Sequence, residues 1–381
     1  MNTTQFLYHF FWKLLGAFMP DKQPSMFVWG IQKQIFMEET QIYQNLRTNL
    51  LGGDLTSPIG ISSDLGLDES TIDMLIQHGA GFGTLGSYTF RETEEHQQRL
   101  YYVKGKKTGV IKNDLRQNNM NVSVKKLSQR RYLPHFVGIS LISFNADDVK
   151  IGDGREIPGY FNELELMTQK TAPYGDYLVI DVSHPNMPLF PLLSDESSMI
   201  PLIQTIQRTA QIAAPISTPK ILLKVPYDIS LLEIKSVSQI ALKTGIDAII
   251  VAGFASLQKN ATWVKNSGVE ALSDSTFVTG TPLKEGLIKL VQEFRKRTNG
   301  FIPLIASGAI TSGQDAFDLL AAGACAVEIG SVFFTDGPCA IHKINADLSR
   351  ILREKRIRNI ASVIGINTPL DPNIEIQDLF N

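Results

Sequence analysis

The sequence is poor in cysteine, with only Cys325 and Cys339 among its 381 residues. Two cysteines cannot form a disulfide framework, so we expect a disulfide-free, reducing compartment. The sequence shows no metal-ligand pattern around either of them, and this argues against a zinc site. We therefore expect a hydrophobic core, rather than crosslinks or metals, to hold the fold together.

The sequence also lacks a surplus of either charge and any long hydrophobic run. Lys and Arg number 36 against 38 for Asp and Glu, whereas nucleic-acid binding needs a basic footprint. The apolar stretch 6–19 is too short to span a bilayer. It has no basic leader and no obvious cleavage site, which argues against a secretory signal. We find no internal repeat and no low-complexity linker.

The first 40 residues instead have the pattern of two short amphipathic helices, in 6–19 and 25–38. In the first, the apolar positions are Leu7, Phe10, Phe11, Leu14, Leu15 and Phe18, which share one helical face. Such helices can lie in a membrane interface. The alternative is that they cap the main domain and bury each other. The aromatic density of the first favours the membrane, so we predict a membrane extension over 1–40 and a main domain over 50–381.

The rest of the chain alternates between strand and helix patterns. The predicted strands are 59–62, 81–86, 136–142, 177–182, 220–225, 248–252, 301–306 and 326–329. The predicted helices are 69–78, 121–130, 160–171, 199–213, 231–244, 284–297, 314–322 and 338–355. Residues 100–103 and 109–111 can pair as a hairpin, and 254–282 is a long connection. Eight strand–helix units in sequence predict an α/β fold of the (β/α)8 TIM-barrel type, with its site at the carboxyl ends of the strands.

The stretch 177–186 is the most informative one for chemistry. An apolar strand there delivers Asp181, Ser183, His184 and Asn186 at its carboxyl end. Asp181 and His184 can form an orienting pair, with His184 as a general base. The alternative is that His184 is a loop residue with no catalytic role. A hydrolase triad through Ser183 is weak, because the side chains of adjacent residues diverge.

Two short turns near the end of the chain have the pattern of a phosphate site. Residues 306–309 follow the seventh strand, and Gly330 and Ser331 follow the eighth, where such barrels bind phosphate. Small residues let backbone N–H groups approach an anion, although ordinary tight turns would look the same. Lys224, on the fifth strand, can reach a flavin ring or a phosphate from inside the barrel. The alternative is a solvated Lys at the strand mouth; a buried Lys needs an anionic partner.

Taken together, these landmarks resemble the dihydroorotate dehydrogenases of the membrane-associated, quinone-linked class. The motifs that carry the resemblance are Ser57–Ile61, Gly86–Thr89, Asn118–Asn119, Val182–Pro188, Leu222–Lys224, Thr279–Leu283, Ala306–Ser312, Ala322–Ala324 and Asp336–Pro338. The resemblance implies FMN over the barrel mouth and oxidation of dihydroorotate to orotate in pyrimidine biosynthesis. It also implies a quinone acceptor that enters beneath the amino-terminal helices, and a peripheral-membrane location on the cytoplasmic side of an inner membrane or its equivalent.

Carried over residue by residue, the resemblance assigns FMN contacts to Ser87, Lys224, Gly280, Gly308 and Ser331, and substrate contacts to Asn118, Asp181 and Asn186. His184 stands at the position of the family's catalytic Ser. The remaining departures are Leu67 for a substrate-binding Lys, Asp181 and Ser140 for Asn, Ile142–Phe144 for Gly–Lys–Asn, Gly253–Phe254 for Asn–Thr, and Gly330 for Tyr. A bound polar group that loses its partner costs about 1–3 kcal/mol, so these departures weigh against the family's substrate.

Three hypotheses follow from the sequence. The first is a divergent dihydroorotate dehydrogenase that uses FMN and quinone. The second is a flavin-binding barrel that acts on another substrate, with Asp181 and His184 as a new acid–base pair. The third is a non-catalytic relative that serves as a binding protein. A fold does not by itself separate them.

Overall fold

The computed structural model describes residues 41–90, 99–103, 108–112, 118–129, 135–150, 156–184, 192–256, 276–337, 339–375, 377 and 379. The predicted amphipathic extension, 1–40, and the predicted site residue Asn186 lie outside this set. Within it, no helix is both long and apolar enough to cross a bilayer.

Eight parallel strands close into a barrel, as the sequence predicted. They are β3 (Ile59–Ile61), β4 (Phe82–Thr89), β8 (Phe136–Leu141), β11 (Tyr177–Asp181), β12 (Lys220–Val225), β13 (Ala248–Ala252), β16 (Leu304–Ser307) and β17 (Ala326–Ile329). Each pairs with the next in this order, and β17 pairs back to β3. A short strand, β7 (Asn118–Asn119), extends the sheet beside β4. The predicted (β/α)8 architecture is confirmed.

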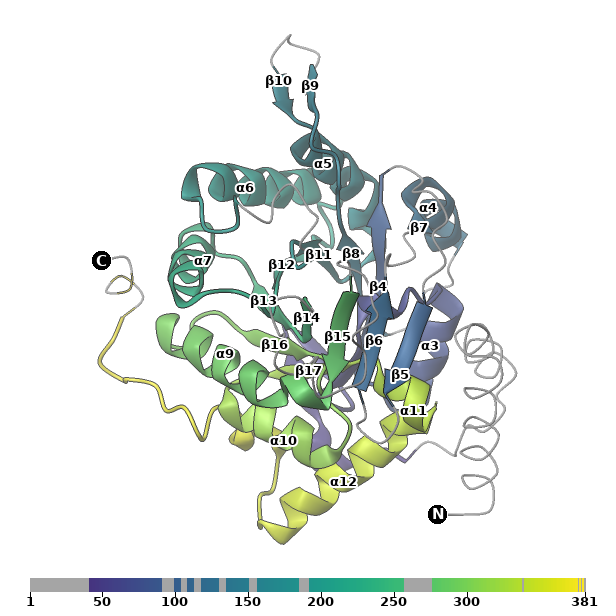
Figure 1. The fold of residues 1–381 in the computed structure, drawn as a ribbon, viewed down its shortest axis with the longest axis vertical. Helices are drawn as coiled ribbons and strands as arrows, with labels where there is room; N and C mark the ends of the chain where they lie inside the picture. The colour runs from purple at the N-terminus through teal and green to yellow at the C-terminus, as the bar shows by residue number, and fades with distance from the viewer. Residues whose placement is uncertain are drawn as a thin grey trace.

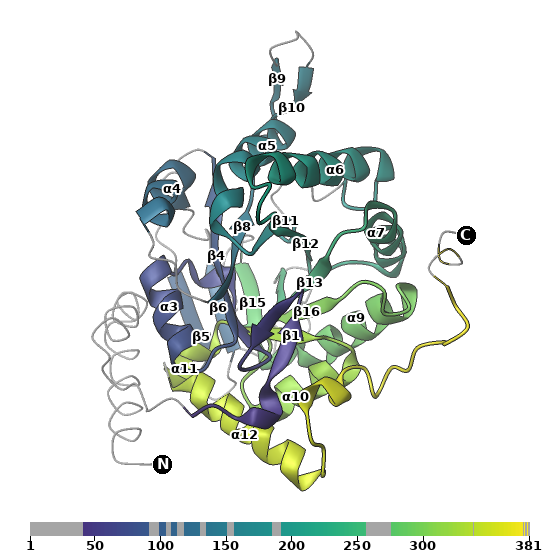
Figure 2. The same ribbon diagram turned by 180° about the vertical axis from the view of Figure 1, so that it is seen from behind.

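Helices surround the barrel (Figures 1 and 2). They are α3 (Glu69–Gln77), α4 (Met120–Gln129), α5 (Gly159–Thr171), α6 (Glu196–Ala213), α7 (Leu231–Thr244), α9 (Lys284–Arg297), α10 (Gly313–Ala322), α11 (Val332–Asp336) and α12 (Ala340–Glu354). Single turns of 3-10 helix are η2 (Gln44–Leu46), η3 (Ser63–Leu65), η4 (Ala172–Tyr174), η7 (Thr281–Leu283) and η8 (Ile360–Val363). Local sequence sets the helix ends: Ser230 and Glu233 form a capping box at the start of α7, and Gly245 ends that helix with a φ of 62°.

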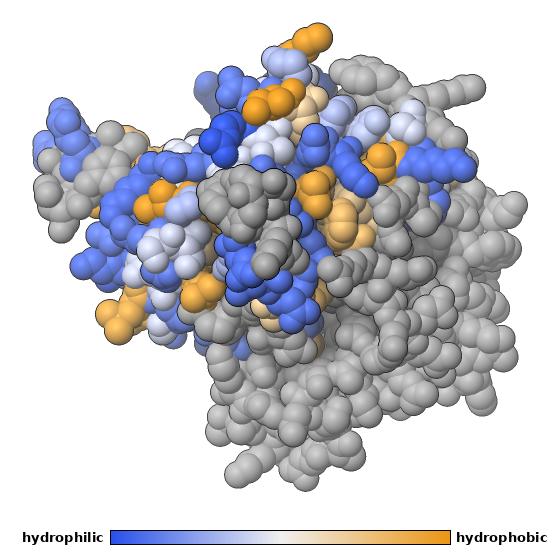
Figure 3. Space-filling view, turned by 90° about the horizontal axis from the view of Figure 1, so that it is seen from above, coloured by the Kyte–Doolittle hydropathy of each residue, from blue (hydrophilic) through white to orange (hydrophobic). Residues whose placement is uncertain are grey.

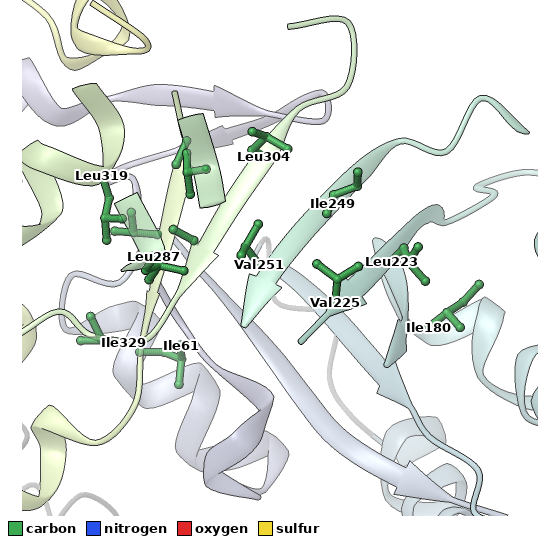
Figure 4. Close-up of a cluster of buried hydrophobic side chains, with 14 of the residues drawn as sticks. Ile61, Ile180, Leu223, Val225, Ile249, Val251, Leu287, Leu304, Leu319 and Ile329 are labelled. Carbon is green, nitrogen blue, oxygen red and sulfur yellow. The ribbon is translucent and has the colours of Figure 1, made fainter. Parts of the chain in front are cut away.

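Side chains alternate between the two faces of each strand. On β12, Leu223 and Val225 point outward to the helices, where they join the larger hydrophobic cluster (Figure 4). Leu222, which precedes Leu223, belongs to a separate cluster inside the barrel. Period-two alternation therefore gives β12 an apolar outer face and turns Lys224 toward the barrel axis. On the face seen in Figure 3, the described surface is mostly hydrophilic, with hydrophobic residues scattered over it.

Two glycines make room for the rings that fill the amino-terminal end of the barrel. A Cβ added to Gly60 would lie 2.3 Å from the ring of Phe82, and one added to Gly138 would lie 1.9 Å from the ring of Tyr177. A hairpin of β1 (Thr48–Leu50) and β2 (Gly53–Leu55) contributes leucines to the same inner cluster. This end is thus sealed by packing, so the chemistry is confined to the other end.

A four-stranded antiparallel sheet lies next to the carboxyl ends of the strands. Its order is β14 (Phe254–Ser256), β15 (Thr276–Gly280), β6 (Thr108–Lys112) and β5 (Arg99–Val103). The predicted hairpin of 100–103 with 109–111 is confirmed as β5 and β6. The long connection after β13, in contrast, contains strands that the sequence analysis did not identify. Because β14 begins two residues after β13 ends, it brings this sheet to the barrel mouth.

Other boundaries differ in smaller ways. The strand predicted at 301–306 begins only at Leu304, because the turn that ends α9 runs through Phe301, whose amide donates to the Thr298 carbonyl. The last predicted helix, 338–355, corresponds to α12, and the short separate helix α11 before it was not predicted. A hairpin of β9 (Asp148–Lys150) and β10 (Glu156–Pro158) was also missed, and it projects beyond α5 (Figure 1).

The tight fit at Gly138 gives a prediction about stability. We expect Gly138→Ala to lower the free energy of unfolding by about 1–3 kcal/mol, because the new methyl group overpacks the barrel against Tyr177. Urea denaturation followed by circular dichroism measures this. Gly330→Ala is the matched control: its added Cβ meets no atom closer than 3.8 Å, and we expect a change within about 0.5 kcal/mol. Equal effects of the two substitutions would contradict the packing argument.

Candidate active site

The centre of the barrel mouth is an ammonium group held by two carboxylates. Lys224, on β12, hydrogen-bonds the Oδ1 atom of Asp64, and its Nζ atom lies 3.4 Å from the Oδ2 atom of Asp181 on β11. The side chains of Lys224 and Asp181 are both 1% exposed, and that of Asp64 is 21% exposed. The alternative of a solvated Lys at the strand mouth is therefore wrong: Lys224 is buried, and the protein supplies its anionic partners.

Asp181 uses both of its oxygens within this cluster. Its Oδ2 atom accepts a hydrogen bond of 3.0 Å from the Ser87 hydroxyl, and its Oδ1 atom accepts from the amide and the hydroxyl of Ser183, at 3.0 and 2.6 Å. Burial opposes ionisation, but Lys224 and the bonds from Ser183 outweigh it and hold the pKa of Asp181 below its ordinary value. The same carboxylates hold the pKa of Lys224 above its ordinary value, against the effect of burial. Both side chains are therefore charged at neutral pH.

A second buried carboxyl, Glu328, points into the barrel from β17. Its Oε1 atom accepts a hydrogen bond of 2.7 Å from the Thr84 hydroxyl, which in turn lies 2.8 Å from the Tyr177 hydroxyl. Burial raises the pKa of Glu328 to about 7, although Lys224 opposes the shift. Unlike Asp181, this carboxyl is poised to change its charge near neutral pH.

The loop after β3 places Asp64 above Lys224. Ser62 caps η3, with its hydroxyl accepting from the Asp64 amide and donating to the Asp64 Oδ2 atom at 2.9 Å. Gly66 ends the turn in the left-handed region, with a φ of 58°, which glycine adopts without strain. The turn therefore fixes the Asp64 carboxylate by two contacts to Ser62 as well as by Lys224.

His184 lies in an aromatic row rather than beside Asp181. Its ring is 5.2 Å from that of Phe144 and 5.3 Å from that of Phe277. Phe277 contacts Phe254, whose ring lies 5.5 Å from the Nζ atom of Lys224. The row thus links the outer sheet to the ion cluster. The hydrogen bonds of Asp181 go to Ser87 and Ser183, so the proposed pair of Asp181 with His184 is not formed directly.

The predicted phosphate turns have the backbone shape that an anion site requires. After β16, Gly308 and Ala309 have φ values of 90° and 60°. In the described structure, the N–H groups of Ala309, Gly330 and Ser331 have no protein acceptor. Space is open beside Gly330: the atom nearest to an added Cβ there would be the Cβ of Ser62, at 3.8 Å. Unpaired amides and a nearby buried ammonium are the donors that the phosphate and ring of FMN need, so this set of residues fits that cofactor.

The other residues predicted for the site differ in how closely they lie to the barrel mouth. The hydroxyl of Ser87 is buried and lies 2.8 Å from that of Ser140. Gly280 ends β15 with a φ of 103°, next to the mouth. Asn118 is placed by its backbone in β7, and Leu67 is buried in the outer hydrophobic cluster. Leu67 therefore serves the core and offers nothing to a ligand.

The charge of the described mouth does not match an anionic substrate. Asp64 and Asp181 are opposed there by the single ammonium of Lys224. Dihydroorotate is a carboxylate, and it would meet a net negative cluster at this point. A like charge in a buried site is unfavourable. The residues that fit FMN therefore do not equally fit dihydroorotate.

Sequence reasoning missed Asp64 and Glu328 as site residues. Both carried a signal: Asp64 lies three residues after the end of the buried strand β3, and Glu328 interrupts the apolar strand β17 at an inward-facing position. A charge at such a position in a barrel strand needs a partner inside the barrel. Phe277 was also missed, because the strand that carries it was not predicted.

Comparisons with known proteins decide the family. The family model described as "Dihydroorotate dehydrogenase" matches residues 45–352. The chain belongs to the dihydroorotate dehydrogenase family. It is 27% identical over 323 residues to a "Dihydroorotate dehydrogenase (quinone)" of Erythrobacter litoralis, which covers 84% of this chain and 88% of that protein.

Other relatives agree. A protein of the same name from Azorhizobium caulinodans is 25% identical over 358 residues, covering 92% of this chain and 96% of that one. The crystal structure of DHODH from Eimeria tenella in complex with ferulenol matches with a TM-score of 0.79 at 21% identity, covering 91% of this chain and 95% of that chain. This likeness supports the shared barrel fold. The resemblance to quinone-linked dihydroorotate dehydrogenases is therefore confirmed at the level of family and fold.

The ion cluster gives a prediction for Lys224. We expect Lys224→Met to lower the free energy of unfolding by about 3–5 kcal/mol near pH 7, because Asp181 is left buried without its cation. In the native protein, the lowered pKa of Asp181 stabilises the fold above the pKa of the unfolded chain, and this contribution is lost as pH falls through the native pKa. The defect of the variant should therefore shrink in acid, where Asp181 becomes neutral.

Urea denaturation at neutral and acidic pH measures both effects. Lys243→Met is the matched control, because Lys243 pairs with Glu196 on the surface, where an ion pair contributes about 0–1 kcal/mol. A Lys224→Met variant no less stable than Lys243→Met would show that the cluster is not a buried ion pair.

Proposed function

We propose that this protein is an FMN-dependent oxidoreductase of the quinone-linked dihydroorotate dehydrogenase type, acting in pyrimidine biosynthesis. The observation that carries the proposal is the buried Lys224, at the carboxyl end of β12, together with the unpaired amides in the turns after β16 and β17 at the same end of the barrel. Its relatives named dihydroorotate dehydrogenase (quinone) support oxidation of dihydroorotate with a quinone as acceptor. Gly308 and Ser331 would hold the phosphate of FMN, and Ser87, Lys224 and Gly280 would lie along its ring.

The chain's own residues have separate roles in this reaction. FMN, when bound, supplies the acceptor for a hydride. Lys224 provides the positive charge next to it, and Asp64 and Asp181 hold that ammonium in place. His184 is the group in the mouth that can take a proton from the substrate, since imidazole titrates near neutral pH. Phe144 and Phe277 pack on its ring and fix its position.

A specific observation favours a second candidate function. The Asp64–Lys224–Asp181 cluster carries a net negative charge, which disfavours a carboxylate substrate. The second candidate is therefore a flavoprotein that oxidises a neutral or cationic small molecule with the same His184 and the same cofactor site. The two candidates differ in the substrate alone, so one experiment separates them.

We expect the purified protein to be yellow and to show the absorption spectrum of bound flavin. Dihydroorotate, added without oxygen, should bleach that spectrum, and a quinone should restore it. A colourless protein that takes up no added FMN would refute both candidates. A yellow protein that dihydroorotate does not bleach would refute the first and leave the second.

His184→Ala tests the base in the same assay. The variant should bind flavin as the native protein does, but its reduction by substrate should fall by about 10²–10⁴-fold, as expected for loss of a general base. His78→Ala is the control, because His78 caps the end of α3, away from the mouth. Unchanged reduction of His184→Ala would show that His184 is not the base.

We further propose that residues 1–40 bind a membrane peripherally and lead the quinone to the barrel. The support is the amphipathic pattern of 6–19 and 25–38 and the quinone named for the relatives. The full-length protein should sediment with phospholipid vesicles, and a chain without residues 1–38 should stay in the supernatant. Replacing Phe10 and Phe11 by Ser should weaken sedimentation in the same direction. A full-length protein that does not sediment would refute the membrane role.

A further inference from the structure

The buried Glu328 is connected to the barrel mouth by two serine hydroxyls. Ser307, on β16, occupies the position that pairs with Glu328 on β17. Its hydroxyl acts on the Glu328 carboxyl as a hydrogen-bond donor that lowers the pKa, against the larger effect of burial. The same hydroxyl lies 3.2 Å from the Ser62 hydroxyl, which lies 2.9 Å from the Oδ2 atom of Asp64. Ser62, Ser307 and Glu328 are all buried, whereas Asp64 is partly exposed. The four side chains thus form one line from the barrel interior to its mouth.

The number of hydrogens in this line is informative. The line has three links, Glu328–Ser307, Ser307–Ser62 and Ser62–Asp64, but the two hydroxyls supply only two hydrogens. If both carboxyls are ionised, each hydroxyl donates to its own carboxylate and the 3.2 Å contact between the serines holds no hydrogen. All three links are made only when one carboxyl carries a proton. The line of four side chains therefore forms all of its hydrogen bonds when it holds one proton more than the two hydroxyl hydrogens.

We propose that Glu328 stores a proton inside the barrel, and that Ser307 and Ser62 carry it to and from Asp64 at the mouth. In the outward direction, the O–H bond of Glu328 breaks and its proton passes to the Ser307 oxygen. Ser307 passes its own proton to Ser62, and Ser62 passes its own to the Asp64 carboxylate. Each serine gains and loses one proton, and no electrons move.

The charges around Glu328 explain why the proton rests there. Lys224 on β12 faces both carboxyls, and it hydrogen-bonds Asp64 directly. Tyr177 on β11 and Thr84 on β4 are neutral, and Thr84 occupies one Glu328 oxygen while the other remains for the proton. Asp181 is ionised and adds negative charge beside Lys224. Burial, which raises the pKa of Glu328 to about 7, agrees with storage near neutral pH.

The relay gives the mouth a proton exchanger beside the ion cluster. A dehydrogenase that removes a hydride from carbon must also remove a proton, and Asp64 is placed to pass one inward. This use of the relay rests on the proposed function. The relay itself does not, because it is read from the protein's own carboxyl groups without substrate.

Infrared titration of the full-length protein tests the stored proton. The carbonyl stretch of a protonated carboxyl should disappear as pH rises through about 7, and Glu328→Gln should remove this step. The Gln side chain can still accept from Thr84, so the variant should fold. Because the native pKa of Glu328 is raised, the native protein should lose stability relative to Glu328→Gln as pH rises from about 4.5 to about 7. A native spectrum and stability profile identical to those of Glu328→Gln would overturn the proposal.

The serine route is tested by the rate of the same signal after a rapid change of pH. Ser62→Ala and Ser307→Ala should each slow the appearance of the carboxyl band at least tenfold, because each breaks the line. Ser140→Ala is the matched control: it removes a buried hydroxyl that bonds Ser87, outside the line, and should leave the rate unchanged. Native rates in both Ser62→Ala and Ser307→Ala would overturn the route through these serines.

Discussion

The pairing of one buried ammonium with two carboxylates is the constraint on which the barrel mouth depends. Lys224 cannot be buried at the end of β12 without an anion, and it has Asp181 beside it on β11 and Asp64 above it. Asp181 could not be buried alone either, whereas Asp64 is partly exposed. The charges of Lys224 and Asp181 are therefore tolerated only because of their partners, and the three together fix the loop after β3 against the centre of the barrel.

Sequence patterns predicted the scaffold of this cluster but not the cluster itself. Apolar runs and alternation placed β12 and turned Lys224 inward, and they also placed Asp181 at the end of β11. Asp64, however, is 160 residues from Lys224 in the chain. Only the closure of β17 on β3 brings it across the barrel. Local sequence patterns cannot predict such a contact. The burial of Lys224 shows that it needs an anionic partner, but the sequence does not identify which residue that partner is.

The strands at the mouth were missed for a different reason. β14 is only three residues long, and its five-residue partner β15 follows after a long intervening segment. β15 contains two threonines and ends in a glycine, so neither strand stands out as an apolar run. Their stability comes from pairing with each other and with β6, which is a tertiary effect. Phe254 and Phe277, which reach the ion cluster and His184, could not be assigned to the site without that sheet.

Membership of the dihydroorotate dehydrogenase family fixes the fold and the place of the site, but the polar residues decide what the site can do. Among the buried side-chain polar atoms of the described residues, those without a partner belong to Thr71, Ser238 and Thr368. None of these lies in the network that runs through Lys224 and Glu328.

A site that had merely decayed would be expected to leave stranded donors and acceptors, each at a cost of about 1–3 kcal/mol. Here Asp181 and Asp64 both pair with Lys224. The carboxyl groups of Asp181, Asp64 and Glu328 each accept a hydrogen bond from a hydroxyl group. Such mutual pairing argues that the mouth is organised around charge and proton position.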